Sequence, residues 1–348
     1  MSRTRTTGAS SSERCDVDVI VLERGKLPPV LLRDVLAAGS PMPTEVRLGP
    51  ALGEDAAVID VAAGCLVVAA DPITLTGEGI GRSAVAVNAN DVAVMGVRPR
   101  WFLATVLLPV GTTDSDVRRL FAELHAAVTD EGAALVGGHS EITGAVRQPI
   151  VSGAMLGIGS PDGIVNSSGA SPGDVVVQVG DAPIEGAAVL AAAGSWSVPW
   201  PPTGVAVPSI SVVEPALAAA ELGASAMHDP TEGGLAAGLH EIAEASGVAI
   251  VVDPSRVAWY PPAVAVLVAV GADPWSTLAS GTLIATFRPD GVDAAVRELR
   301  RLGHVVAVIG RAKHGQGVTD RSGTLIPWPA RDEVARLLDR DAGTEEGR

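Results

Sequence analysis

Two short apolar runs, joined by a small turn, constrain the N-terminal part of this chain more than any other feature. Residues 53–60 read Gly-Glu-Asp-Ala-Ala-Val-Ile-Asp, and residues 66–71 read Leu-Val-Val-Ala-Ala-Asp. Val- and Ile-rich runs of this length predict an antiparallel hairpin. If Asp60 pairs with Leu66, the same register sets Asp55 opposite Asp71. Opposed carboxylates repel each other, so the pair predicts a bound cation such as Mg²⁺. The alternative is a slipped register with two solvated acids.

The size and composition of the chain predict two domains with large cores. The chain has 348 residues, of which 47% are hydrophobic and 3% aromatic, and its mean hydropathy is +0.33. Such a chain can bury a large core, and the shortage of aromatics favours tightly packed α/β layers. The periodicity breaks near residues 161–173. We predict a disordered tail at 1–24, an N-terminal domain at 25–160, a C-terminal domain at 161–340 and an acidic tail at 341–348.

Charge and cysteine usage narrow the partners and the compartment. The formal net charge of −15 argues against a nucleic-acid partner, although a nucleotide can still bind through a metal ion and backbone N–H groups. Cys15 and Cys65 form neither a metal-binding spacing nor a disulfide framework, which predicts a cytoplasmic protein. Residues 1–14 lack the apolar region of a signal peptide, and the longest apolar run, 263–272, is too short to span a bilayer. We therefore expect no membrane contact.

Three polar residues interrupt an apolar helical pattern at residues 83–96. The pattern ends at Gly96, and glycine is the usual residue just after a helix. Asn88, Asn90 and Asp91 are mediocre helix formers, and Asn88 and Asp91 share one face. An unpaired carboxylate in such a helix is costly, so we predict that this face contacts the same cation. A polar stripe that hydrogen-bonds to a neighbouring loop is the alternative.

Residues suited to a phosphate group occur in two further segments. Residues 137–143 follow a predicted strand at 133–136 and read Gly-Gly-His-Ser-Glu-Ile-Thr. Gly137 and Gly138 let the backbone approach a phosphate chain, while His139 and Glu141 add polar reach. A tight turn is the ordinary alternative for this segment. Lys26, near the start of the predicted N-terminal domain, either reaches a phosphate or is solvated.

A second glycine pair follows Asp229. We predict that Asp229 is the N-cap of a helix and that Pro230 is its first residue. The free N–H groups of such a helix start form an anion site. Gly233 and Gly234 would lie in the first turn, where each costs about 1 kcal/mol relative to Ala. Capping does not explain that cost, so we predict a nucleotide contact here.

Eight motifs occur in order along residues 25–338. They are Gly25-Lys-Leu-Pro28, Gly53-Glu-Asp-Ala-Ala57, Asp71-Pro-Ile-Thr74, Asn88-Ala-Asn-Asp-Val-Ala-Val-Met-Gly96, Gly137-Gly-His-Ser-Glu-Ile-Thr143, Ile184-Glu-Gly186, His228-Asp-Pro-Thr-Glu-Gly-Gly-Leu235 and Ala279-Ser-Gly-Thr-Leu283. Each motif alone is weak. Together they make the chain resemble the AIR synthase (PurM-like) superfamily, and within it the AIR synthase related proteins near the hydrogenase maturation factor HypE.

The resemblance implies an α/β and α+β two-domain fold. An N-terminal α/β domain would share a β-barrel with a second subunit, beside a C-terminal α+β domain. The resemblance also implies a homodimer that binds ATP and Mg²⁺ in the cleft between the domains. Such enzymes use ATP to phosphorylate a substrate oxygen, which gives either an activated intermediate or the product. The expected acceptor is a small molecule or a peptide amide.

The resemblance further assigns roles to individual residues. The metal-binding acids match Asp55, Asp71 and Asp91. The expected nucleotide contacts are Asn88, Asn90, Gly137, Gly138, Gly233 and Gly234, and the expected catalytic residues are Lys26, His139, Glu141 and Asp229. Several relatives have Asp where this chain has His139, so Glu141 is expected to replace that ligand, or the ligand is absent.

Two departures keep other functions open. HypE proper ends in a cysteine that carries a carbamoyl group, whereas this chain ends Thr344-Glu-Glu-Gly-Arg348. HypE-like protein maturation would therefore require a carrier protein that supplies the thiol. Selenophosphate synthetases have a Cys or Sec beside a glycine-rich segment, and Cys15 lacks that setting. An ATP-binding regulatory protein without turnover is the remaining alternative.

Overall fold

The computed structural model describes residues 29–30, 33, 44–49, 51–74, 79–193, 200–201 and 206–345. Its first half contains a seven-stranded sheet in the order β1-β2-β3-β7-β5-β6, with β4 also paired to β7. β5 and β6 run parallel, and the other neighbours run antiparallel. The strands are β1 (Val46–Leu48), β2 (Ala57–Val61), β3 (Gly64–Ala69), β4 (Pro72–Ile73), β5 (Trp101–Pro109), β6 (Ala134–Thr143) and β7 (Ile150–Gly159).

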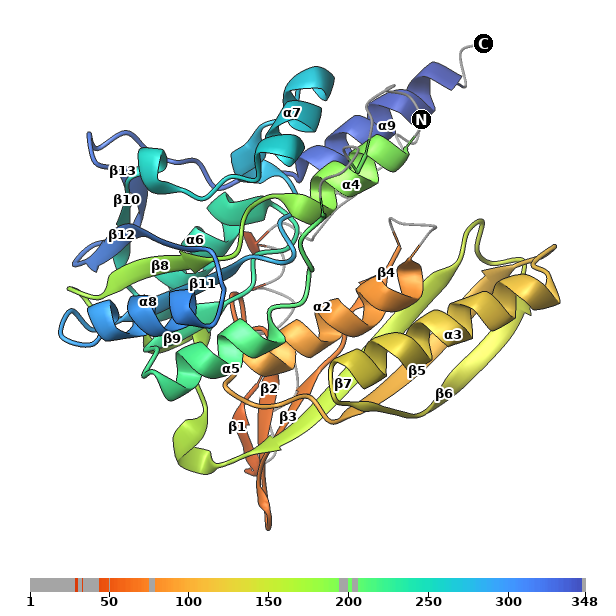
Figure 1. Ribbon diagram of the computed structural model, residues 1–348, viewed down its shortest axis with the longest axis horizontal. Helices are drawn as coiled ribbons and strands as arrows, with labels where there is room; N and C mark the ends of the chain where they lie inside the picture. Colours follow the sequence, from red (N-terminus) through yellow and green to blue (C-terminus); the bar gives the residue numbers. More distant parts are fainter. Residues whose placement is uncertain are drawn as a thin grey trace, which may run out of the picture.

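Two helices lie side by side on one face of this sheet, α2 (Ile80–Val94) and α3 (Asp114–Asp130) (Figure 1). α3 starts with a capping box in which Thr113 and Asp116 bond each other's backbone N–H groups. α2 is buried on nearly every side because the sheet, α3 and the second half of the chain all pack against it. Gly96 follows the end of α2 with a positive φ, which confirms the predicted helix end.

The predicted hairpin of β2 and β3 is present, but its predicted register is wrong by one residue. Asp60 pairs with Cys65 instead of Leu66. This register leaves a two-residue turn between Val61 and Gly64, the commonest hairpin loop, where the predicted register needs three residues. Asp55 and Asp71 both lie beyond the paired residues, so the hairpin ladder does not oppose them directly.

The second half of the chain contains a six-stranded sheet in the order β13-β10-β12-β8-β11-β9. Its strands are β8 (Val175–Val179), β9 (Ala226–His228), β10 (Ala249–Val252), β11 (Leu283–Phe287), β12 (Val306–Lys313) and β13 (Gly317–Asp320). The helices of this half are α4 (Ile184–Ala192), α5 (Val213–Glu221), α6 (Gly234–Ser246), α7 (Pro261–Val270), α8 (Val292–Arg301) and α9 (Glu333–Glu345). Short 3₁₀ turns occur at Pro161–Gly163, Ser167–Gly169, Pro254–Arg256 and Pro274–Ser276.

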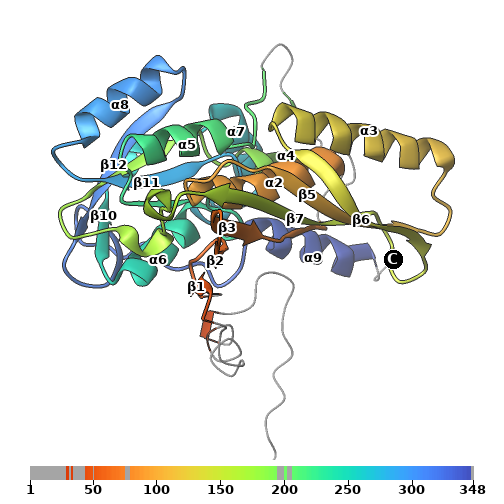
Figure 2. The ribbon, with the colours of Figure 1, turned by 90° about the horizontal axis from the view of Figure 1, so that it is seen from below.

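Helices cover both faces of the second sheet, with α5 and α8 on one side and α6 on the other (Figure 2). The central strand β8 shows why: Val175 and Val177 pack toward α5 and α8, while Val176 packs toward α6. A strand covered on both faces is mostly apolar, and β8 is apolar except for Gln178. The predicted two-domain α/β fold is therefore confirmed, with one sheet in each half of the chain, and the β-barrel shared with a second subunit stays a prediction.

The two sheets share one hydrophobic core. The largest buried cluster contains Val92 of α2, Phe102 of β5, Val177 of β8 and Phe287 of β11, so the halves pack against each other through α2 and α5. α4, α7 and α9 form a separate helical cluster at one end (Figure 1). None of the helices in the described part of the chain combines the length and apolar composition needed to cross a membrane.

Candidate functional site

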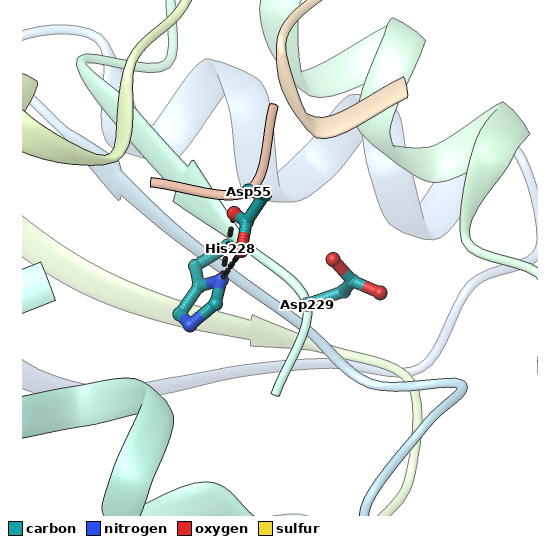
Figure 3. A group of neighbouring side chains, drawn as sticks. All are labelled: Asp55, His228 and Asp229. Carbon is teal, nitrogen blue, oxygen red and sulfur yellow. Dashed lines mark hydrogen bonds and ion pairs between the residues drawn. The ribbon is translucent and has the colours of Figure 1, made fainter. Parts of the chain in front are cut away.

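A buried histidine joins two carboxylates where the halves of the chain meet. Nδ1 of His228, the last residue of β9, lies 2.7 Å from the carboxylate of Asp55 in the loop before β2 (Figure 3). Nε2 lies 2.7 Å from Oε2 of Glu241 on α6. Asp55 also accepts a hydrogen bond of 3.2 Å from the hydroxyl of Ser167. Asp55 from the first half is therefore held by two residues of the second half, His228 and Ser167, and His228 is held in turn by Glu241.

The charge of His228 follows from these contacts. Burial alone would lower the pKa of His228, but the carboxylates of Asp55 and Glu241 raise it well above its usual value. The imidazolium form then donates a hydrogen bond from each nitrogen. A histidine in that state has no lone pair for a metal ion, so His228 orients Asp55 and neutralises part of its charge.

Asp229 lies beside this pair, and its carboxylate is turned away from the imidazole ring (Figure 3). Asp229 is 1% exposed, and neither carboxylate oxygen has a hydrogen-bond partner among the described residues. Burial and the nearby carboxylates of Asp55 and Asp71 raise its pKa well above the usual value, although His228 opposes that shift. A buried carboxylate without partners is unstable unless a proton or a cation reaches it.

Asp91 completes the group from the other side. It lies on α2, is 7% exposed, and has a pKa raised well above the usual value by burial and then by Asp229, Asp71 and Asp55. Four acids from four separate segments therefore lie close enough to repel one another. Single ligand atoms of Asp55, His228 and Asp229 lie within 4.8 Å of one another. Because His228 has no lone pair to offer, the candidate ligands are the carboxylate oxygens of the four acids, and oxygen ligands fit a hard divalent cation.

The two predicted nucleotide contacts on α2 have structural roles. Asn88 accepts a hydrogen bond of 2.9 Å from the backbone N–H of Asp71 and donates to the carbonyl oxygens of Asp71 and Ala84 at 3.1 and 2.8 Å. Asn90 donates to the carbonyl of Ile210 at 2.9 Å and accepts from the N–H of Val212 at 2.8 Å. The alternative reading, a polar stripe bonded to neighbouring loops, is what the structure shows for both asparagines.

The predicted helix start at Asp229 is wrong, because α6 begins at Gly234 with Gly233 as its N-cap. Both glycines have positive φ, which explains them without a ligand. Their N–H groups are also occupied: that of Gly233 donates to Oδ2 of Asp332 at 2.7 Å, and that of Gly234 donates to the carbonyl of Thr231 at 3.0 Å. The carboxylate of Asp332 thus occupies the position predicted for an anionic ligand.

The segment with His139 and Glu141 is expected from the sequence to follow a strand that ends at residue 136, but it is part of the edge strand β6 (Ala134–Thr143). Gly138 fits there because a Cβ would lie 1.9 Å from the carbonyl oxygen of Ala104. His139 pairs with Thr105, Thr105 with Ser152, and Ser152 with Pro72. Three strand spacings put His139 about 14 Å from Pro72, the neighbour of Asp71.

Nε2 of His139 lies 3.3 Å from Oε2 of Glu141. Within one chain, both residues thus lie apart from the acids. Gly137 shares their exposed strand. Lys26 lies outside the described residues.

Sequence reasoning missed His228 and Glu241. His228 stands beside Asp229 in a quoted motif, whereas the only signal for Glu241 is an acid within the apolar pattern of α6.

Known proteins are similar to this chain over most of its length. The family AIR synthase related protein, N-terminal domain, matches residues 53–159, and its C-terminal domain counterpart matches residues 171–321. The chain is 33% identical over 270 residues to thiamine-monophosphate kinase of Mycobacterium tuberculosis (strain H37Rv), a match that covers 71% of this chain and 76% of the kinase. It is 28% identical over 300 residues to carbamoyl dehydratase HypE of Rhizobium leguminosarum bv. viciae, with 82% and 86% covered.

Solved structures show the same fold. Hydrogenase maturation protein HypE in complex with ATP superposes with a TM-score of 0.67 at 25% identity, covering 81% of this chain and 92% of that one. HypE in a HypE–HypF complex superposes with a TM-score of 0.72 at 22% identity, covering 86% and 99%. The second likeness is evidence of fold alone.

Proposed function

Because the chain belongs to the AIR synthase related protein family, we propose that it is an enzyme that uses ATP to phosphorylate or otherwise activate an oxygen atom of an acceptor, with release of ADP. One relative is a kinase and another a dehydratase, and a similar HypE structure holds ATP. The acceptor that we propose is an amide or a similar oxygen-bearing group, as the name of the carbamoyl dehydratase suggests, whereas the kinase is named for a phosphate ester.

The observation that carries this proposal is the convergence of four carboxylates with an unpartnered Asp229 among them. We propose that Asp55, Asp71, Asp91 and Asp229 together hold Mg²⁺, which extends the predicted metal set by Asp229. Bound magnesium would neutralise charge on the triphosphate during phosphoryl transfer. Without a cation these carboxylates repel each other. A bound cation attracts each carboxylate and so offsets that repulsion.

His228 and Glu241 act as positioning residues in this proposal. The imidazolium holds Asp55 by a bond of 2.7 Å and is itself held by Glu241 at 2.7 Å. Fixed carboxylates need little rearrangement when the charge of the transition state develops. The backbone of Asp71 is fixed in the same way by Asn88.

A homodimer remains part of the proposal. β6 is an edge strand of the first sheet, and its side chains Val136 and Ile142 are exposed, as is Leu103 on the adjacent β5. Exposed apolar edge strands are usually covered. A second subunit packed over this edge would also cover His139 and Glu141, whose side chains are exposed in a single chain.

Calorimetry with ATP tests the metal assignment. Wild-type protein should bind ATP with Mg²⁺ and bind it much more weakly in EDTA, whereas Asp91→Asn and Asp229→Asn should lose the magnesium dependence. Asp290→Asn, which removes an exposed acid far from these segments in the sequence, is the matched control and should bind like the wild type. Unchanged magnesium-dependent binding in both site variants would defeat the assignment.

HypE-like maturation with a partner thiol is the second candidate, favoured by the HypE relatives and by the likeness to HypE in a complex with HypF. It predicts that the protein co-purifies with a carrier that presents a cysteine, and that this carrier stimulates ADP release. A regulatory ATP-binding protein would bind Mg²⁺ and ATP but release no ADP with any acceptor. Measuring ADP release with amide, formyl and phosphate-ester acceptors, with and without candidate carriers, separates these outcomes.

A further inference from the structure

A cavity of 260 Å³ opens between the two halves, next to the acids. The first half contributes Asp71 and the residues that follow it as far as Thr74, and the second half contributes Glu185, Glu232 and Ser280, among others. Every titratable side chain among its described lining residues is an acid. The cavity therefore has the size for a small acceptor and a lining that disfavours negative charge.

Glu185 is the most deeply placed acid of the cavity. It lies in the first turn of α4 and is 9% exposed. Burial raises its pKa, the nearby hydroxyl of Ser280 lowers it in part, and Glu232 raises it further. Ser280 is 1% exposed, and its hydroxyl oxygen has no hydrogen-bond partner of ordinary geometry among the described residues. Two buried polar groups thus face a cavity that can supply them with a ligand.

Helix stabilisation alone does not account for Glu185. An acid in the first turn of a helix interacts favourably with the helix dipole, but an exposed acid gains that interaction without losing hydration. Here the carboxylate is buried, and a buried carboxylate is stable when it accepts hydrogen bonds from N–H or O–H groups. The nearby hydroxyl of Ser280 is one such donor, and the cavity has room for another.

We propose that this cavity is the acceptor subsite and that Glu185 selects acceptors with an N–H group, neutral or cationic, over phosphate esters and other anions. The inference rests on the proposed ATP-dependent function and narrows its acceptor. The N–H group donates to Glu185, Ser280 supplies a second polar contact, and the oxygen to be activated faces Asp71 and the other acids. A phosphate ester in the same cavity would bring its negative charge close to Glu185 and Glu232.

A matched pair of probes tests the selection. N-acetylglycinamide and N-acetylglycine have the same shape, but the first ends in a neutral amide and the second in a carboxylate. Their binding is measured by NMR titration of the wild type loaded with Mg²⁺ and AMP-PCP. The amide should bind at least about tenfold more tightly, because like charges brought together are strongly unfavourable.

Two variants locate the selection. Glu185→Gln keeps the shape and removes the charge, so the amide-to-acid ratio should fall toward one while nucleotide affinity stays within about threefold. Asp181→Asn removes a half-buried acid that does not line the cavity and should leave the ratio unchanged. Thermal melting of both variants establishes that they are folded.

Three results would overturn the inference: equal or tighter binding of the acid, an unchanged ratio in Glu185→Gln, or no binding of either probe at millimolar concentration to the nucleotide-loaded wild type. Failure of the wild type to bind Mg²⁺ and AMP-PCP would instead defeat the proposed function itself. The two failures are therefore distinguishable in one set of titrations.

Discussion

Replacing Asp229 by Asn should stabilise the metal-free protein while it abolishes magnesium-dependent nucleotide binding. Asp229 is buried, its two oxygens have no hydrogen-bond partner among the described residues, and its neighbours Asp55, Asp71 and Asp91 are acids. Asn keeps the size of the side chain, removes the charge, and can donate a hydrogen bond to a neighbouring carboxylate. Most substitutions of buried residues destabilise a protein, so the expected sign is unusual.

The structure bounds the size of this effect. Ligand oxygens of Asp55 and Asp229 lie within 4.8 Å of each other. Two unit charges at that separation repel by roughly 3 kcal/mol at an effective dielectric constant of about 20. The charge of His228 offsets part of that repulsion, and protonation of one acid limits the rest. We expect a net gain of about 1–2 kcal/mol in the free energy of unfolding, or a rise of roughly 2–4 °C in Tm.

Differential scanning calorimetry in EDTA measures this gain, and the same scans with Mg²⁺ and ATP measure the loss of binding. A ligand at 100 times its Kd stabilises the wild type by about 2.7 kcal/mol, and Asp229→Asn should gain almost none of that. Asp290→Asn, an exposed acid, should stay within about 0.5 kcal/mol of the wild type in both conditions. The reasoning is refuted if Asp229→Asn melts below the wild type in EDTA and is still stabilised by Mg²⁺ and ATP.

Three further perturbations follow from the same contacts. His228→Gln leaves Asp55 and Glu241 buried without a counter-charge, so it should lower the free energy of unfolding by about 3–5 kcal/mol. The control His125→Gln, on the exposed side of α3, should change it by less than about 0.5 kcal/mol. Urea titrations of both variants measure the two free energies of unfolding. Burial raises the pKa of Asp332 to about 7, from about 3.9 in the unfolded chain. The contribution of Asp332 to the free energy of unfolding is therefore complete below about pH 4 and is lost as the pH rises through about 7. The Tm of the wild type relative to Asp332→Asn should therefore fall between pH 5 and pH 8, and a difference that stays constant or grows would contradict this. Asn88→Ala removes three hydrogen bonds, two of them to the backbone of Asp71, and should cost about 1–3 kcal/mol of stability and weaken Mg²⁺-dependent ATP binding, as calorimetry can detect.

Local sequence patterns predicted the elements well where one physical rule dominates. The apolar periodicity and the final glycine predicted α2, and its Gly96 has the expected positive φ. The hairpin register failed because apolar alternation is satisfied by two registers one residue apart on strands of only five and six residues. The turn length decided between them, and the sequence around Val61 and Gly64 permits either length.

Both glycine pairs have structural reasons that the sequence did not reveal, and their nucleotide contacts stay predictions, because glycine serves close packing as well as ligand binding. Gly138 is required by the carbonyl of Ala104 on the neighbouring strand, and Gly233 by its positive φ. Neither requirement is visible in the sequence, because the contact of Gly138 depends on the neighbouring strand and the φ of Gly233 depends on how the chain enters α6. A cost estimated from helix propensity therefore pointed to a ligand where the backbone alone needed glycine.

The sequence indicated which acidic residues belong to the site, but it could not predict how their side chains are arranged. Asp55 and His228 are separated by 173 residues, and Glu241 reaches the same imidazole from α6. No local rule relates such positions, since their meeting depends on how the two sheets pack. The cue available from the sequence is energetic: Asp91 in an apolar helix needs compensation, and the compensating groups had to come from other segments.

The contacts that assemble the site also restrict how it can work. Asn90 of α2 is bonded to the segment before α5, Ser167 is bonded to both Asp55 and Met227, and the two sheets share one core. Rotation of one half away from the other would break these buried hydrogen bonds and expose apolar surface, at a cost of many kcal/mol. Domain opening is therefore a poor route for substrate entry, and the acids are held near one another before any ligand arrives. Repulsion among fixed carboxylates is relieved when a cation binds, so at the proposed Mg²⁺ site the rigidity of the seam would contribute to affinity for the metal-bound nucleotide.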